Sequence, residues 1–267
     1  MAFVLKKKGS VPYLVVPRFG GKAHVRVVFS TRHGGISQGP FASLNLGFHT
    51  GDFPARVAAN RRILYSILGL KEEQTFTTRQ VHGNRVFVIK DSRDLAVKGL
   101  VEADAQVTAL KGVALTGFFA DCLAVYLYDP VGDVIGLAHA GWRGTVSGIA
   151  RKCLEAMRQH FGSEPERCFA ALSPAAGPCC YEVGEVVADA VRKVFPEEWG
   201  VLLPAGAGRW KLDLWRANFE MLHEIGLKRE NITVSRLCTI CRQDLFFSYR
   251  GSGGTTGRMA ALLLLEV

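Results

Sequence analysis

A cysteine and a histidine lie at the open end of a hairpin that the sequence predicts. The apolar run Leu123–Asp129 follows Cys122, and a second apolar run, Val134–Ala140, contains His139. The segment between them, residues 130–132, has the composition of a tight turn. Folding the chain about this turn places Cys122 and His139 opposite each other, with Cβ atoms roughly 4.5–5.5 Å apart. A shift of one residue would place them on opposite faces of the hairpin.

A thiolate beside an imidazole is a ligand pair for Zn²⁺, with copper as the second choice. A catalytic zinc site takes three protein ligands and leaves one position open, so another segment should supply a third ligand. His82 is favoured because it lies in a polar turn before a strand, although spacing alone does not separate it from His33 or His49. The full set of candidates is His24, His33, His49, His82, His160 and His223.

Both members of the pair also have an ordinary structural interpretation. A cysteine beside an apolar strand is most often a small core residue. A histidine within such a strand is most often hydrogen-bonded in the core. The structural interpretation is the stronger one for Cys122 or His139 alone, whereas for the facing pair the two interpretations are evenly supported.

The segment after His139 is suited to an anion. It predicts the end of a strand, a turn bracketed by glycines and a helix capped by Thr145. Free N–H groups at the helix N-terminus, together with Arg143, would hold phosphate next to the proposed metal. The alternative is a tight turn with Arg143 in solvent.

Polar loops offer further groups to a substrate. Arg32 and Asn45 lie in glycine-rich loops, for which turn chemistry is the more typical explanation. Arg250 and Arg258 flank the glycine-rich stretch 251–257, which could close over a phosphate but lacks the lysine of a P-loop.

Two other cysteine motifs are weaker signals. Adjacent Cys179 and Cys180 precede a predicted helix and are interpreted as structural, because neighbouring cysteines rarely bridge; the alternative is that one of them lies near the site. Cys238 and Cys241 have the CxxC spacing of redox and zinc sites, but no second CxxC accompanies them.

Length and composition exclude several protein classes. The 267 residues contain no repeat or linker, which predicts one domain over residues 1–267. Seven scattered cysteines do not suggest a disulfide framework, so a cytoplasmic location is expected. The longest apolar run, Met259–Leu265, is far below the roughly 20 residues of a membrane span. A net charge of +9 without an RNA-binding motif favours small anionic ligands over nucleic acid.

Hydrophobic patterning predicts a mixed α/β fold of layered sheets flanked by helices. Short joins between neighbouring strands require antiparallel pairing. Helices are expected after a cap at Asp52, after a cap at Thr145, and over residues 183–195 and 212–225. Strands are expected over residues 25–31, 85–89, 105–110, 113–119, 123–129, 134–140, 168–173, 232–237 and 259–267.

Short motifs occur in a fixed order along nearly the whole chain. They are TRHGG from residue 31, SLNLG from 43, QVHG from 80, ADA from 103, ADC from 120, HAGWRG from 139, GPCCYEV from 177, FSYR from 247 and TGR from 256. Together they resemble the laccase-domain family, whose members are called multicopper polyphenol oxidases, peptidoglycan editing factors or purine nucleoside phosphorylases. The chain departs from that pattern at Ala124, Ala176 and Gly251, and the last change puts an anion contact from its loop in doubt.

The resemblance implies a single α/β domain with a mononuclear metal site formed by His82, Cys122 and His139. Zn²⁺ is the expected ion and Cu²⁺ the second choice. The implied substrates are purine nucleosides and phosphate: phosphorolysis of adenosine, inosine and methylthioadenosine, and deamination of adenosine. The expected protein is a monomer or homodimer that binds neither nucleic acid nor membrane.

Roles for the remaining residues are working hypotheses. Arg143 and Arg32 would hold phosphate, Asp121 would orient a ligand or carry a proton, and Asn45 would bind the sugar. Three alternatives stay open: a copper oxidase of phenols, a cysteine hydrolase that edits a peptidoglycan precursor with Cys122 as nucleophile and His139 as base, and a non-catalytic metal-binding scaffold.

Overall fold

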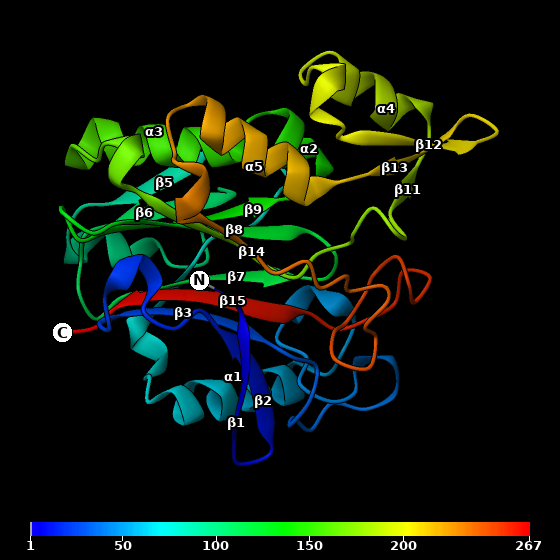
Figure 1. Cartoon of the computed structure of the whole chain (residues 1–267). Helices are drawn as coiled ribbons and strands as arrows, with labels where there is room; N and C mark the ends of the chain where they lie inside the picture. The colour runs from blue at the N-terminus through cyan, green and yellow to red at the C-terminus, as the bar shows by residue number, and fades with distance from the viewer. Residues whose placement is uncertain (1) are drawn as a thin grey trace.

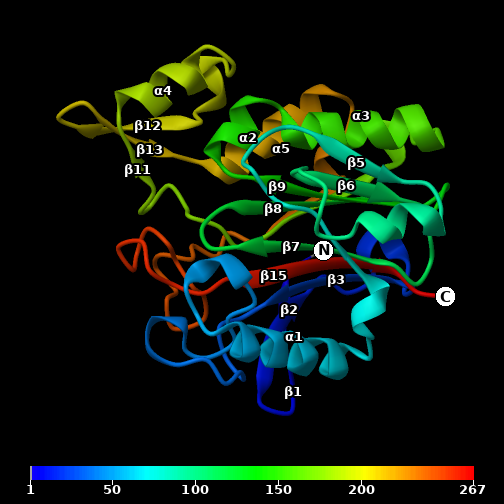
Figure 2. The same cartoon turned by 180° about the vertical axis from the view of Figure 1, so that it is seen from behind.

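The computed structural model describes residues 2–267 and arranges them in four layers (Figure 1). Two six-stranded sheets pack face to face. Helix α1 (Pro54–Leu68) covers the outer face of the first sheet. Helices α2 (Trp142–Val146), α3 (Ile149–Phe161) and α5 (Leu214–Glu224) cover the outer face of the second, and Figure 2 shows the same layers from behind.

The strands fall into three sheets. The first has the order β1 (Val4–Lys8), β2 (Val11–Val15), β3 (Val25–Ser30), β15 (Met259–Leu265), β7 (Ala114–Phe119) and β4 (Thr75–Thr77). The second has the order β14 (Ile232–Val234), β10 (Phe169–Leu172), β8 (Leu123–Asp129), β9 (Val134–Ala140), β6 (Ala105–Thr108) and β5 (Val86–Ile89). A small sheet of β11 (Glu182–Val183), β13 (Arg209–Leu212) and β12 (Leu202–Gly206) extends to one side with α4 (Glu185–Arg192) (Figure 1).

Side-chain alternation explains the layering. In β8, Tyr126 and Tyr128 point into the space between the two large sheets, whereas Val125 and Leu127 pack against the helices. Strands β8 and β9 are buried on both faces, which is why they have continuous apolar sequences.

The predicted mixed α/β class is confirmed, and all nine predicted strands are present with ends shifted by a few residues. The sequence did not predict β1, β2, β4 or the small sheet. Strand β1 contains three lysines and is exposed along its length, and β4 has only three residues, so neither shows the apolar run of a core strand. Within residues 2–267, no helix has the length and hydropathy needed to cross a membrane.

Two predicted helix caps are wrong. Thr145 lies inside the short helix α2, and α3 begins after Gly148, whose left-handed backbone separates the two helices. Phe53, not Asp52, is the residue before α1. The Asp52 carboxylate is buried and accepts hydrogen bonds from other loop side chains.

The predicted register of the β8–β9 hairpin is wrong by two residues. His139 lies opposite Ala124, and Leu123 lies opposite Ala140. Continuing that pairing places Cys122 opposite Gly141. Because the shift is an even number of residues, Cys122 and His139 stay on the same face of the hairpin.

Candidate metal centre

His82, Cys122 and His139 come together at one edge of the sandwich. One ligand atom from each lies within 4.8 Å of the other two. His82 is in the connection from β4 to β5 and Cys122 in that from β7 to β8, and both connections cross from the first sheet to the second. Two imidazoles and one thiolate at this spacing fit a zinc ion with an open coordination position.

A buried carboxylate, Asp104, holds two of these three residues. It accepts hydrogen bonds from the backbone N–H groups of Val81, His82 and Gly83 at 3.2, 3.0 and 2.7 Å. It also pairs with Nδ1 of His139 at 2.8 Å, which leaves Nε2 of that ring for a metal. Histidines that bind metals commonly donate their other N–H to a carboxylate, so the contact supports a ligand role for His139.

The charge of Asp104 is itself stabilised. Burial disfavours the carboxylate, but the His139 hydrogen bond and charge and the backbone N–H donors outweigh it and lower the pKa of Asp104. Sequence reasoning assigned this residue no role. The available signal was its position directly before strand β6, which pairs with β9 and so brings residue 104 beside His139.

Cys122 and His139 stabilise each other's charged form. Burial disfavours the Cys122 thiolate, but the His139 charge and hydrogen bond, followed by His82, lower its pKa to about 6. Burial likewise disfavours the His139 imidazolium, but Cys122 and Asp104 raise its pKa. The pair therefore favours the Cys122 thiolate, the form that binds metals, and metal binding would release the Nε2 proton of His139.

The backbone at the site is held in an unusual conformation. His82 has φ of 58° and Asp121 has φ of 84°, in the left-handed region that residues other than glycine rarely adopt. Such positions cost on the order of 1–3 kcal/mol and persist where the surroundings fix them. Here the Asp104 carboxylate fixes the turn that carries His82.

Gly141 faces the proposed ligands with no room for a side chain. A Cβ atom there would lie 2.8 Å from Sγ of Cys122 and 3.2 Å from Nδ1 of His82. We expect Gly141→Ala to displace these atoms and weaken Zn²⁺ binding by about tenfold or more, measured by competition with a chromophoric chelator.

Gly184→Ala is a matched control for this substitution. Gly184 has nearly the same backbone angles as Gly141, and a Cβ there would meet nothing within 4 Å. The control should bind Zn²⁺ as the wild type does. Equal affinity of Gly141→Ala and wild type would contradict the proposed ligand geometry.

Two of the residues predicted to bind substrate use their side chains for hydrogen bonds between loops. The buried Asn45 amide is fully hydrogen-bonded within the protein, and its oxygen accepts the backbone N–H of Arg258 at 2.9 Å. The Arg32 guanidinium donates to two backbone carbonyls and lies over the ring of Phe247. A sugar at Asn45 or a phosphate at Arg32 would have to displace these contacts, so the geometry favours loop positioning for both.

The three other predicted residues are arginines with different surroundings. Burial lowers the pKa of Arg258, while the charges of Cys122, Tyr249 and Asp121 oppose this. Arg250 donates to a backbone carbonyl of β11. Arg143 is exposed over the ring of Trp142, and its guanidinium has no hydrogen-bond or ion-pair partner among residues 2–267.

The predicted anion site at a helix N-terminus needs correction. Helix α2 has only five residues, so the dipole at its start is small. Any attraction of phosphate to this turn therefore depends on the Arg143 guanidinium.

Asp121 connects the cysteine turn to the C-terminal loops. Its Oδ1 accepts the hydroxyl of Thr239 at 2.6 Å, and its Oδ2 accepts the backbone N–H of Arg250 at 2.6 Å. Because both oxygens accept hydrogen bonds from these loops, the geometry favours the orienting role over proton transfer.

The protein-family model described as "Multi-copper polyphenol oxidoreductase laccase" matches residues 26–266. The chain belongs to this family. It is 41% identical over 245 residues to "Purine nucleoside phosphorylase YlmD" of Geobacillus stearothermophilus, a match covering 88% of each protein. It is 34% identical over 252 residues to "Purine nucleoside phosphorylase YfiH" of Escherichia coli, covering 94% of this chain and 98% of that protein.

Solved structures of this laccase-like family share the fold. The crystal structure of YlmD from Geobacillus stearothermophilus superposes with a TM-score of 0.92 at 36% identity and covers 99% of this chain and 100% of its own. That of the hypothetical protein YfiH from Bacillus licheniformis also gives 0.92, at 33% identity, covering 98% of this chain and 99% of its own. Membership of this family implies metal binding, which the His–Cys–His group fits.

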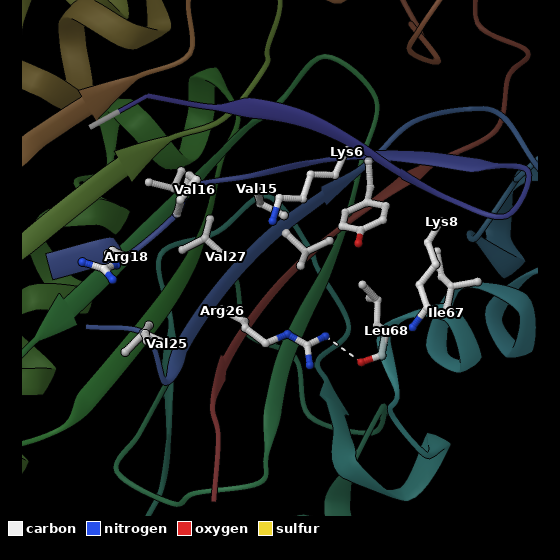
Figure 3. Close-up of a pocket in the computed structure, with 14 residues that line it drawn as sticks. Lys6, Lys8, Val15, Val16, Arg18, Val25, Arg26, Val27, Ile67 and Leu68 are labelled. Atoms are coloured by element: carbon white, nitrogen blue, oxygen red, sulfur yellow. Dashed lines mark hydrogen bonds between the residues drawn. The ribbon is translucent and has the colours of Figure 1, made fainter. Parts of the chain in front are cut away.

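A separate groove lies on the outer face of the first sheet (Figure 3). It runs between strands β1–β3 and the end of α1, where Arg26 donates to the carbonyl of Leu68 at 2.7 Å. None of the predicted ligand or substrate residues lines it. The groove is therefore separate from the proposed metal centre.

Proposed function

We propose that this protein is a zinc-dependent purine nucleoside phosphorylase that also deaminates adenosine. The relatives named purine nucleoside phosphorylase supply the substrate class. The observation that carries the proposal is the convergence of His82, Cys122 and His139 around one point, with Asp104 holding the two histidine segments. The proposed substrates are inosine, adenosine and methylthioadenosine, with phosphate.

The three proposed ligands suit zinc better than copper chemistry of the laccase type. They are too few for a multicopper cluster, although a single Cu²⁺ remains the second choice. When bound, the ion supplies Lewis-acid charge and acidifies water. The chain's own contribution is to keep Cys122 ionised, to turn Nε2 of His139 toward the site, and to leave one coordination position open.

In phosphorolysis, a phosphate oxygen attacks the anomeric carbon of the ribose while the bond to the purine nitrogen breaks. The purine takes up a proton and leaves, and the sugar leaves as its 1-phosphate. Arg143 and Arg258 would offset the charge of the phosphate, and Asp121 would hold the loop that follows Arg250 against the site. In deamination, water adds to the purine carbon that bears the amine, and ammonia leaves.

Base release that depends on phosphate is the direct test. The zinc-loaded protein should convert inosine and phosphate to hypoxanthine and ribose 1-phosphate, and methylthioadenosine to adenine, as followed by chromatography. Without phosphate, base release should stop, while adenosine should still yield inosine and ammonia. Absence of phosphate-dependent base release would exclude the phosphorylase, and absence of inosine would exclude the deaminase.

Arg143→Gln tests the proposed phosphate contact. Because this guanidinium is exposed and has no partner in the described chain, its loss should cost little stability. We expect the KM for phosphate to rise about tenfold, since a charge-assisted contact contributes roughly 1.5 kcal/mol. The KM for inosine should change little. Arg158→Gln, an exposed arginine on α3, is the control and should leave both values unchanged.

The contact between Cys122 and His139 also favours an alternative function, that of a cysteine hydrolase. The Cys122–His139 pair also resembles the nucleophile and base of a cysteine hydrolase, which could edit a peptidoglycan precursor. Chelation separates the two functions because such a hydrolase would stay active without metal. A copper oxidase would instead lose its activity when oxygen is removed, and a non-catalytic scaffold would show no turnover in any of these assays.

A further inference from the structure

Four cysteines that the proposed function does not use form a second cluster. The Sγ atoms of Cys179, Cys180, Cys238 and Cys241 all lie within 4.8 Å of one another. That of Cys241 is 3.5 Å from Cys179 and 3.3 Å from Cys180. Four thiolates around a tetrahedral zinc, with Zn–S bonds of about 2.3 Å, have sulfur atoms about 3.8 Å apart. The two Cys241 separations are slightly shorter than that value, and no pair of these sulfur atoms is more than 4.8 Å apart.

The same arrangement suits a disulfide less well. A disulfide joins two sulfur atoms at about 2.05 Å, whereas Cys241 approaches two different sulfur atoms at nearly equal, longer distances. In a four-cysteine metal site every sulfur atom lies at a similar distance from the other three. In a disulfide one sulfur atom lies much closer to a single partner.

The loops that carry these cysteines already present hydrogen-bond donors to sulfur. Backbone N–H groups of Cys241, Gly177 and Ile240 point at the buried Sγ of Cys238, the one from Gly177 at 3.3 Å. Donors of this kind stabilise a thiolate. Residues 175 and 238 also form a parallel bridge, which holds the two loops in register.

We propose that Cys179, Cys180, Cys238 and Cys241 bind one Zn²⁺ as four thiolates, in a structural site separate from the His82–Cys122–His139 centre. Binding releases the four thiol protons, and the filled coordination sphere leaves no position for a substrate. Cys179 and Cys241 are exposed, so the ion can reach the site from solvent.

This second site would join two parts of the molecule that are far apart in sequence. One loop leads into β11 and the small sheet, and the other follows β14; Figure 1 shows them on the same side of the protein. The second loop also carries Thr239, which binds the Asp121 carboxylate beside Cys122. Zinc bound at the four cysteines would therefore help to hold Asp121, and with it the neighbouring Cys122, in position.

Metal counting tests the proposal. Protein purified under reducing conditions and loaded with Zn²⁺ should contain two equivalents per chain by elemental analysis. The Cys179→Ser/Cys241→Ser variant should retain one, and His82→Ala/Cys122→Ser should also retain one, because each removes a different site. Cys168→Ala, which alters a buried cysteine outside both clusters, should retain two. Circular dichroism checks that each variant is folded.

Cobalt substitution gives a spectroscopic readout of the same two sites. Co²⁺ in the wild type should show intense sulfur-to-metal charge transfer, and the spectrum that remains in His82→Ala/Cys122→Ser should be that of a four-sulfur tetrahedral site. A single zinc equivalent in the wild type that is lost in His82→Ala/Cys122→Ser would overturn the proposal. So would a disulfide among these four cysteines in the Zn²⁺-loaded protein, detected by mass spectrometry without reduction.

Discussion

Replacing His139 by alanine is expected to lower kcat/KM for inosine phosphorolysis by at least about 100-fold. The substitution removes one of three proposed ligands and leaves Asp104 without its histidine partner. Loss of an outer partner of a metal ligand already costs 10–100-fold, so loss of the ligand itself should cost no less. Elemental analysis after dialysis should show that the zinc bound at this centre is gone.

His160→Ala is the control for this prediction. His160 is exposed near the end of α3 and belongs to neither cluster of metal-binding side chains. Its loss should change neither zinc content nor turnover. Full activity of metal-free His139→Ala would show that the chemistry does not depend on the proposed centre.

Asp104→Asn should have the second largest effect, although Asp104 does not contact the proposed metal. Asparagine keeps the size of the side chain but replaces one of the two acceptor oxygens with an NH₂ group. The N–H groups among residues 81–83 that donate to that oxygen would lose their acceptor. The turn at His82 would lose support, and His139 would lose the carboxylate that selects its tautomer. We expect Zn²⁺ affinity to fall 10–100-fold.

A chelator competition titration measures this loss, and Asp129→Asn is its control. Asp129 is also a buried carboxylate, but it lies at the other end of β8, next to the hairpin turn. The control variant should bind Zn²⁺ as the wild type does even if its melting temperature falls. An Asp104→Asn protein with wild-type zinc affinity would exclude the positioning role of Asp104.

The sequence was sufficient for the layered fold because its core strands are long apolar runs. Strands β8, β9 and β15 are buried on both faces, so their composition alone marks them. Strand β1 and the small sheet could not be found in this way. Their residues are mostly exposed, and their pairing depends on partners that a local pattern does not contain.

The candidate centre was only partly predictable from local patterns. The hairpin placed Cys122 and His139 on one face, but its turn spans residues 130–133, one more than the composition suggested, and the observed register differs from the predicted pairing by two residues. Asp104 was not identified because its role depends on three backbone N–H groups from a distant turn. The four-cysteine cluster was missed for a related reason: its two halves are separated by more than fifty residues and meet only in the fold.

The position of His82 and Cys122 on chain segments that pass from one large sheet to the other has a consequence for the life of the protein. A cation shared with His139 would crosslink the two halves of the sandwich. Unfolding would then require its release, which couples folding stability to the free metal concentration. Under zinc starvation the unfolded fraction would rise and proteases would remove it faster, so cellular abundance of the protein would follow zinc supply.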